Sequence, residues 1–277
     1  MRFDSDDRHF ERPRRQGRQV RQSRRVRSCL NGTICPDRKW LDAGMTPSRF
    51  QKQIRFLQNR LSPQGYAGLH LTVGVLVVLI CGWCFGEIAE DVSHGDPIVR
   101  VDRDVAVWFH QHAAPTITQV ARMISFFGSV EWLTAASIGV ALFLVSRREW
   151  LNASLVALVM AGGGTLNVVL KHFLHRERPV LENPLVTLSS YGFPSGHTMG
   201  ATLLYGLLAL LAWKNLRNDA ARLACVVGAC FWILLIGLTR IYLGAHYLTD
   251  VLGALTAGLF WLVFCWTAFE TLRRRRD

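Results

Sequence analysis

Long apolar blocks follow one another along the chain from residue 69 onward, with only short polar connections between them. The hydrocarbon core of a bilayer is about 30 Å thick, so a helix that crosses it needs about 20 mostly apolar residues. Half of all residues in the chain are hydrophobic, and they are concentrated in these blocks. This pattern predicts an all-α polytopic membrane protein.

The apolar blocks predict about six transmembrane helices. The predicted spans are residues 69–88, 130–145, 150–170, 198–213, 220–238 and 245–269. Two shorter segments are predicted to lie near the membrane surface: residues 105–112 as a short interfacial helix, and residues 117–127 as an interfacial or tilted lead-in to the second span. The first apolar block begins too late for a cleavable secretory signal, so it is expected to remain as a membrane helix.

Basic residues in the short connections predict the orientation. In a six-span chain the N-terminal segment, Arg147 with Arg148, the 214–222 connection and residues 273–276 would share one side. Cytoplasmic connections are enriched in Lys and Arg, so both termini are expected in the cytoplasm of a bacterial inner or plasma membrane. Residues 171–197 and 240–246 then face the non-cytoplasmic side.

The first 66 residues differ in composition from the rest of the chain. They carry 16 Lys and Arg against 6 Asp and Glu, which accounts for most of the formal net charge of +12. We divide the chain into a basic tail at 1–66, a membrane domain at 67–270 and a basic C-terminus at 271–277. The tail is expected to be disordered and cytoplasmic. It could also contact anionic lipid headgroups, whereas it lacks a recognisable nucleic-acid-binding module.

The seven cysteines do not form a convincing site. Five lie in apolar segments, where cysteine behaves as a small hydrophobic residue. Cys81 and Cys84 have the spacing of a redox motif, but they lie in the middle of a predicted span without the surrounding strands and helix of such enzymes. A redox or metal role is therefore not expected.

A first motif pairs two cations, Lys171 and Arg178, with Pro179 directly after them. Seven residues are nearly two helical turns, so both side chains could project from one face if the helix persists. Lysine offers a mobile point charge, and arginine offers a planar group that matches phosphate oxygens. Alone, such spacing arises easily in basic loops.

A second motif, Pro194-Ser195-Gly196-His197, stands immediately before an apolar block. Ser195 can cap the helix, and Gly196 lets a ligand approach the backbone. The N–H groups at a helix start favour an anion, and His197 could protonate a leaving oxygen there. The alternative reading is a plain helix cap.

A third motif is Arg240-x5-His246-x3-Asp250. His246 and Asp250 are four residues apart, so at the start of a helix they would lie on one face. An aspartate that accepts a hydrogen bond from one ring nitrogen leaves the other nitrogen free to attack an electrophile. Arg240 could join the cations that bind phosphate. A purely structural His–Asp pair is the alternative.

Together the motifs supply a nucleophile, an orienting carboxylate, a general acid and three phosphate-binding cations. They include no carboxylate cluster for a catalytic metal and no zinc-ligand spacing, so neither a metal nor another cofactor is expected. The predicted chemistry is phosphoryl transfer to histidine, with Lys and Arg neutralising the charge.

In order and spacing, the motifs resemble the three-part signature of the type-2 phosphatidic acid phosphatase superfamily, with Thr239 where that family commonly has serine. The resemblance spans residues 171–250. It implies a six-helix fold with a metal-independent active site at the outer bilayer face. It also implies a phosphohistidine at His246 oriented by Asp250, an acid at His197, and phosphate binding by the remaining motif residues (Lys171, Arg178, Ser195, Gly196 and Arg240).

The expected function is therefore hydrolysis of a phosphorylated or pyrophosphorylated lipid, such as undecaprenyl pyrophosphate, phosphatidate or phosphatidylglycerophosphate. Two other functions remain open. The same site could transfer phosphate to an alcohol in place of water, or the protein could be a non-catalytic lipid-binding scaffold. Soluble relatives in the superfamily oxidise halides, but six spans argue against that activity.

Overall fold

In the computed structural model, the described residues are 68–95, 97–180, 185–186 and 190–276. The predicted basic tail, residues 1–66, lies outside them. Eight helices form this part of the chain: α3 (Leu69–His94), α4 (Pro97–Gln111), α5 (Pro115–Phe126), α6 (Val130–Ser146), α7 (Trp150–Leu174), α8 (Gly196–Asn215), α9 (Asp219–Tyr242) and α10 (Leu248–Arg276).

Six segments of this described part are long and apolar enough to cross a membrane. They are α3, α5 together with α6, α7, α8, α9 and α10. This confirms the prediction of an all-α fold with six spans. The outer faces of these helices are apolar and exposed; Trp83, Leu142 and Phe231 are each more than 60% exposed. Such a surface suits contact with lipid, because soluble proteins rarely expose large apolar patches.

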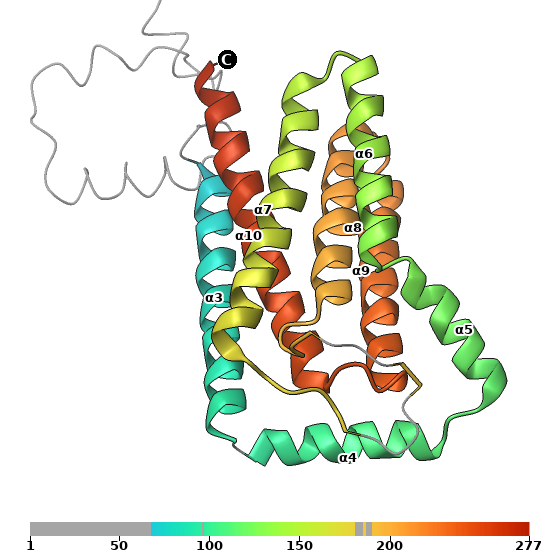
Figure 1. Cartoon of the computed structure of the whole chain (residues 1–277). Helices are drawn as coiled ribbons and strands as arrows, with labels where there is room; N and C mark the ends of the chain where they lie inside the picture. The colour runs from blue at the N-terminus through green and yellow to red at the C-terminus, as the bar shows by residue number, and fades with distance from the viewer. Residues whose placement is uncertain (1–67, 96, 181–184, 187–189, 277) are drawn as a thin grey trace, which may run out of the picture. The chain divides into compact units, whose positions relative to one another are not determined.

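The second span is a helix pair, as predicted. The chain breaks between α5 and α6, and α5 leans away from α6 (Figure 1). Ser129 caps the start of α6, because its side-chain oxygen accepts a hydrogen bond from the Trp132 N–H at 3.2 Å.

The interfacial helix α4 is longer than predicted. It begins at Pro97, eight residues before the predicted start at residue 105. Proline suits the first turn of a helix because its missing N–H needs no partner there. Asp102 and Asp104 lower the hydropathy of this stretch, so the start of the helix was not recognised from the sequence. In the structure Asp102 is nevertheless buried, at 1% exposed. Figure 1 shows α4 lying across the ends of the other helices.

The buried core lies between α7, α8 and α10. Val159, Met199, Leu207 and Ala254 are fully buried in it. Helices in lipid associate through close packing of small residues. Gly74 of α3 is one such residue, since a Cβ there would lie 2.2 Å from the Thr267 Oγ1 of α10. The packing leaves the end of α7, the start of α8, the end of α9 and the start of α10 beside α4 (Figure 1).

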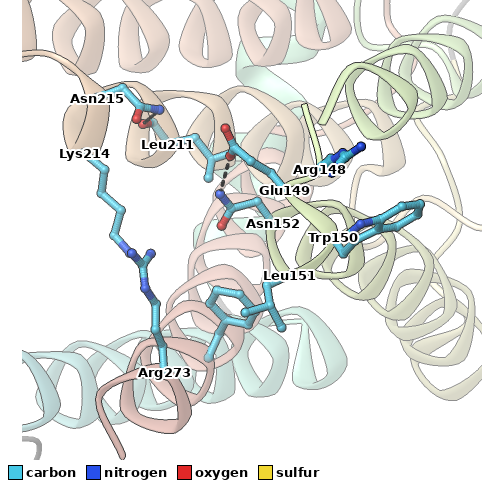
Figure 2. A pocket seen from close by; sticks show the side chains of 10 residues that line it. Arg148, Glu149, Trp150, Leu151, Asn152, Leu211, Lys214, Asn215 and Arg273 are labelled. Carbon is cyan, nitrogen blue, oxygen red and sulfur yellow. Dashed lines mark hydrogen bonds between the residues drawn. The ribbon is translucent and has the colours of Figure 1, made fainter. Parts of the chain in front are cut away.

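At the other end of these helices, a cavity of about 640 Å³ lies between the start of α7 and the ends of α8 and α10. Figure 2 shows Lys214 and Arg273 reaching toward one another from α8 and α10 beside this cavity. Its lining contains none of the motif residues. This cavity is therefore separate from the candidate active site.

Candidate active site

His246 lies in the connection between α9 and α10. The chain turns there at Gly244, which has a positive φ of 67°. The prediction that His246 lies at the start of the last helix was wrong, because α10 begins only at Leu248. The side chains still meet: His246 Nδ1 lies 3.3 Å from Asp250 Oδ2, in the first turn of α10.

Asp250 is fully buried and bonded on both carboxylate oxygens. Its Oδ2 accepts a hydrogen bond from the Tyr247 N–H at 2.9 Å, in addition to its contact with His246. Its Oδ1 forms a salt bridge with Arg176 at 2.6 Å. Because the carboxylate only accepts hydrogen bonds, this arrangement places the His246 proton on Nδ1 and the free lone pair on Nε2.

Electrostatics keep His246 neutral near pH 7. Burial is the main cause that lowers the pKa of His246, to about 4. Asp250 acts in the opposite direction, whereas Arg178 and Arg240 lower the pKa further. A neutral imidazole has the nucleophilic lone pair that attack on phosphorus needs.

Lys171 and Arg178 meet without a continuous helix between them. Their spacing would place both on one helix face only if the helix persisted, but α7 ends at Leu174 and His175 adopts a left-handed conformation with φ of 45°. The chain then folds back, so that both cations donate to the Tyr191 carbonyl, at 2.5 Å and 3.3 Å respectively.

Arg178 also reaches the nucleophile. Its Nη1 donates to the Ala245 carbonyl at 2.5 Å and lies 3.2 Å from His246 Nε2. Burial lowers the pKa of Arg178, with Asp250 opposing that change. The guanidinium group remains charged, because arginine starts from a pKa far above 7.

The Pro194–His197 motif begins α8, as predicted. Ser195 is its N-cap, and its hydroxyl oxygen accepts from the Thr198 N–H at 3.5 Å. Among the described residues, the backbone N–H groups of Gly196 and His197 have no hydrogen-bond partner. His197 lies within electrostatic reach of four titratable residues of the three motifs (Lys171, Arg178, Arg240 and His246).

Arg240 lies in the last turn of α9 and is 4% exposed. Its Nη1 donates to the Ser125 hydroxyl of α5 at 2.7 Å. Its Nε is buried without a hydrogen-bond partner among the described residues. Leaving a buried charged donor unpaired costs about 1–3 kcal/mol or more, so this nitrogen calls for an anionic acceptor.

The structure thus brings all three motifs together at one end of the helices. Within the described part of the chain, no three His, Cys, Asp or Glu side chains are grouped so that they could hold a metal ion. The arrangement offers a neutral histidine, a second histidine and three cations around one place. Such a set can bind a phosphate group and transfer it.

Comparison with known proteins agrees with this geometry. Residues 152–274 match the PAP2 superfamily. The chain is 35% identical over 168 residues to phosphatidylglycerophosphatase B of Bacillus subtilis (strain 168), covering 59% of this chain and 80% of that protein. The chain belongs to the PAP2 superfamily. It is an integral multi-pass membrane protein and a lipid phosphate phosphatase of that superfamily.

Two further proteins similar to this PAP2 phosphatase support the family assignment. Decaprenylphosphoryl-5-phosphoribose phosphatase of Mycobacterium tuberculosis (strain CDC 1551 / Oshkosh) is 31% identical over 174 residues, covering 59% of this chain and 85% of that protein. The crystal structure of a transmembrane PAP2 type phosphatidylglycerolphosphate phosphatase from Bacillus subtilis superposes with a TM-score of 0.64 at 28% identity. It covers 68% of this chain and 94% of that one.

Behind the motif residues of this PAP2 phosphatase lies a buried network that was not predicted from the sequence. Arg176 bonds Asp250 through Nη1 at 2.6 Å and Asp102 of α4 through Nη2 at 2.5 Å. Thr249 joins it, since its N–H and hydroxyl both donate to Asp102, at 3.0 Å and 2.5 Å. Nothing in the sequence distinguished Arg176 from the other basic residues around it. An acidic residue on the buried face of an amphipathic helix was the available signal for Asp102.

Proposed function

We propose that this protein removes a terminal phosphate from a membrane lipid by way of a phosphohistidine at His246, without a catalytic metal. One observation carries the proposal: a buried, neutral His246 held by Asp250 and faced by the Arg178 guanidinium group. The unpartnered Nε of Arg240 supports it, because a phosphate oxygen would supply the missing acceptor.

In the first step, the Nε2 lone pair of His246 attacks phosphorus and the P–O bond to the lipid alcohol breaks. His197, protonated once the anionic substrate lies beside it, gives its proton to the departing oxygen. Lys171, Arg178 and Arg240 bind the phosphoryl oxygens, where negative charge must be held in the transition state. The Gly196 and His197 N–H groups at the start of α8 add donors for the same anion. Ser195 fixes that helix start.

In the second step, a water molecule attacks the phosphohistidine. His197, which lost its proton in the first step, accepts a proton from this water as the P–N bond breaks. Inorganic phosphate leaves, and His246 returns to its neutral form with the proton still on Nδ1. Asp250 holds that ring orientation throughout.

Arg176 and Asp102 act in this proposal as positioning residues. Arg176 holds the Asp250 oxygen that faces away from His246, and Asp102 holds Arg176. A carboxylate fixed on both oxygens keeps the imidazole at the angle that attack requires. Neither side chain touches the reacting phosphate in this arrangement.

The relatives narrow the substrate class. Their names describe a lipid joined through a phosphoryl group to glycerol or ribose that carries a further phosphate. We propose that a lipid of this kind, of the phosphatidylglycerophosphate type, is the substrate. Phosphatidate and undecaprenyl pyrophosphate are the comparison substrates.

We also propose the predicted orientation and domain division for this chain. Arg148, Lys214 and Arg273 gather at the end of the helices far from the motif residues. By the preference of basic residues for the cytoplasmic side, that end faces the cytoplasm. The active site then faces the non-cytoplasmic side, and residues 1–66 form a cytoplasmic tail.

The test is phosphate release by the purified protein in detergent with excess chelator, across these three lipids, beside a His246→Ala variant. Release that resists the chelator and disappears in the variant is the expected result. Rapid denaturation during turnover of ³²P-labelled lipid should also trap an acid-labile, alkali-stable label on the wild type alone. Chelator-sensitive release, or release by the variant, would reject the mechanism.

A further inference from the structure

A second cavity lies beside the active site. It has a volume of about 470 Å³ and lies between the end of α3, one face of α4 and the segment 176–180. Arg178 lines it and also lies 3.2 Å from His246 Nε2. The cavity is therefore continuous with the residues proposed to bind the reacting phosphate. A ligand group in it would be the immediate neighbour of that phosphate.

Arg103 of α4 brings an additional cation to this cavity. It is exposed, and within the described ranges no hydrogen bond or ion pair involves it. The preceding residue, Asp102, is tied to Arg176 and Thr249, so the backbone beneath Arg103 is held at a fixed place beside the site. A cation held in this way can bind an anion with little loss of backbone entropy.

The cavity lining itself is positively charged. Three arginines line it, Arg103, Arg176 and Arg178, against one carboxylate, Glu177. The two carboxylates bonded to Arg176, Asp102 and Asp250, are buried behind it and are not part of the lining. Such a lining favours an anion with a neutral, hydroxyl-bearing group near Glu177.

Tyr247 and several apolar side chains, three of them valines from α3 and α4, also line the cavity. The Tyr247 ring lies 4.7 Å beneath the Arg176 guanidinium carbon, which leaves its hydroxyl as a hydrogen-bonding group. Burial raises the pKa of Tyr247, while Arg176 and Arg103 oppose that change, which also places Arg103 near this ring. The valines, Val92, Val99 and Val107, come from α3 and α4 and suit the first methylenes of a lipid chain.

We propose that this cavity binds the second, non-reacting phosphate of the substrate: the phosphodiester that joins the lipid to its glycerol or sugar headgroup. Arg103 is its cation, and Glu177 and Tyr247 meet the hydroxyl groups of the linker. The inference rests on the proposed function and deepens it. It makes the protein selective for lipids with a phosphodiester and a terminal phosphate over lipids with a phosphomonoester alone.

The test compares dioctanoyl phosphatidylglycerophosphate, which carries both phosphates, with dioctanoyl phosphatidate, which carries only the reacting one. Arg103→Gln should raise KM for phosphatidylglycerophosphate by about tenfold, the loss expected for one hydrogen bond to a charged group. The kcat should be retained, because the reacting groups are untouched. The ratio of the two kcat/KM values should therefore fall by about tenfold.

Arg100→Gln is the matched control. Arg100 is an exposed arginine on the same helix, three residues earlier, and does not line the cavity. This variant should leave the ratio unchanged, which separates the cavity from a general effect of charge on α4. Arg103→Lys should recover part of the lost selectivity, since lysine keeps the charge but not the planar donor pair.

Three results would overturn the subsite. They are an unchanged ratio in Arg103→Gln, an equal loss on both lipids, and the same loss in Arg100→Gln. None of these depends on the histidine mechanism. If His246→Ala kept its activity, the proposed chemistry would fail, whatever the ratio in Arg103→Gln. If His246→Ala were inactive and the ratio did not move, only the subsite would fail.

Discussion

His246 is held on both ring nitrogens before any substrate arrives. Asp250 accepts from Nδ1 at 3.3 Å, and Arg178 lies 3.2 Å from Nε2. Phosphorus has to reach Nε2, so the contact with Arg178 must give way while the contact with Asp250 remains. A guanidinium group that moves from the nucleophile to the phosphate oxygens would link substrate binding to release of the attacking lone pair.

The first prediction concerns protonation of His246. Its pKa of about 4 in the folded protein lies below the ordinary value of 6.5, so the unfolded chain binds the proton more readily. Stability should therefore fall as pH drops from about 6.5 toward about 4, where the folded form also protonates. The neutral nucleophile should persist down to the same region.

Nitrogen NMR of the protein with ¹⁵N-labelled histidine tests this directly. The His246 signal, identified by its loss in His246→Gln, should show the neutral form with the proton on Nδ1 at pH 6. A His246 signal that titrates near 6.5 would contradict the prediction. Activity alone does not separate these cases, because the substrate phosphate also changes its charge in this range.

The second prediction concerns Arg240, whose Nε has no partner among the described residues. Arg240→Lys keeps the charge but loses the planar donors, so inorganic phosphate should bind more weakly as a competitive inhibitor, by about tenfold or more. The inhibition constant should rise together with a fall in kcat/KM. Arg217→Lys, which alters an exposed arginine in the connection between α8 and α9, is the control. Equal inhibition constants in wild type and Arg240→Lys would remove Arg240 from the phosphate site.

The candidate site could be predicted from the sequence because its residues stand in three short motifs. Catalytic residue types at a fixed separation in the sequence, such as His246 and Asp250, can be recognised without knowing the fold. Asp102 could not be found in this way, since its partner Arg176 is 74 residues distant and only the folded chain brings them together. The unpartnered Nε of Arg240 is likewise a property of packing.

At the scale of elements, α4 is the helix whose position matters most to the site. Asp102 joins it to Arg176 and to Thr249 at the start of α10. Both side chains of the Asp102–Arg176 pair are at most 9% exposed. A helix that lies across the ends of the spans is thereby fixed to the carboxylate that orients the nucleophile (Figure 1).

The third prediction follows from this connection. Asp102→Asn removes the charge that pairs Arg176 while keeping the shape of the side chain. Breaking a buried ion pair by removing one partner costs about 3 kcal/mol, so the temperature of unfolding in detergent should fall. The kcat should fall by about tenfold or more with little change in KM, since the substrate is not touched.

Asp104→Asn, which alters an exposed carboxylate two residues later, should change neither quantity. A purely structural role for Asp102 would lower stability and leave the kcat of the folded enzyme intact. That split between unfolding temperature and kcat decides whether Asp102 positions Asp250 or only holds α4 in place.

The helix boundaries near the site show where prediction from the sequence ends. The sequence does not fix where the helix that carries Lys171 ends, because Pro179 lies beyond it and histidine, here His175, can adopt either a helical or a left-handed conformation. The structure ends α7 at Leu174, and the segment that follows packs against Gly192, whose N–H donates to the Arg176 carbonyl at 2.8 Å. Contacts with this distant segment, and not local preference, fix the turn.

At the scale of the whole molecule, hydropathy was sufficient to find the six spans. Each must match the thickness of the same hydrocarbon layer, so length and apolar content identify it independently of its neighbours. Hydropathy does not show which helices pack against each other. Their packing depends on particular close contacts, such as Gly163 against Leu203 and Trp261.

An even number of spans places the first and last described helix ends on the same side. Cations gather at the end that carries the start of α7 and the ends of α8 and α10, whereas the motif residues lie at the other end beside α4. The proposed orientation therefore places the basic end in the cytoplasm and the end with the motif residues on the non-cytoplasmic side.

The fourth prediction places these two ends on opposite sides of the membrane. On a background with all seven cysteines replaced, Ser93→Cys at the end of α3 and Ala220→Cys at the start of α9 each introduce one exposed thiol. In intact cells a membrane-impermeant thiol reagent should label the first and not the second, and permeabilised cells should give both. Labelling of the second thiol alone would invert the orientation and place the active site in the cytoplasm. Because the phosphate would then be released inside the cell, that result would also change which lipid leaflet supplies the substrate.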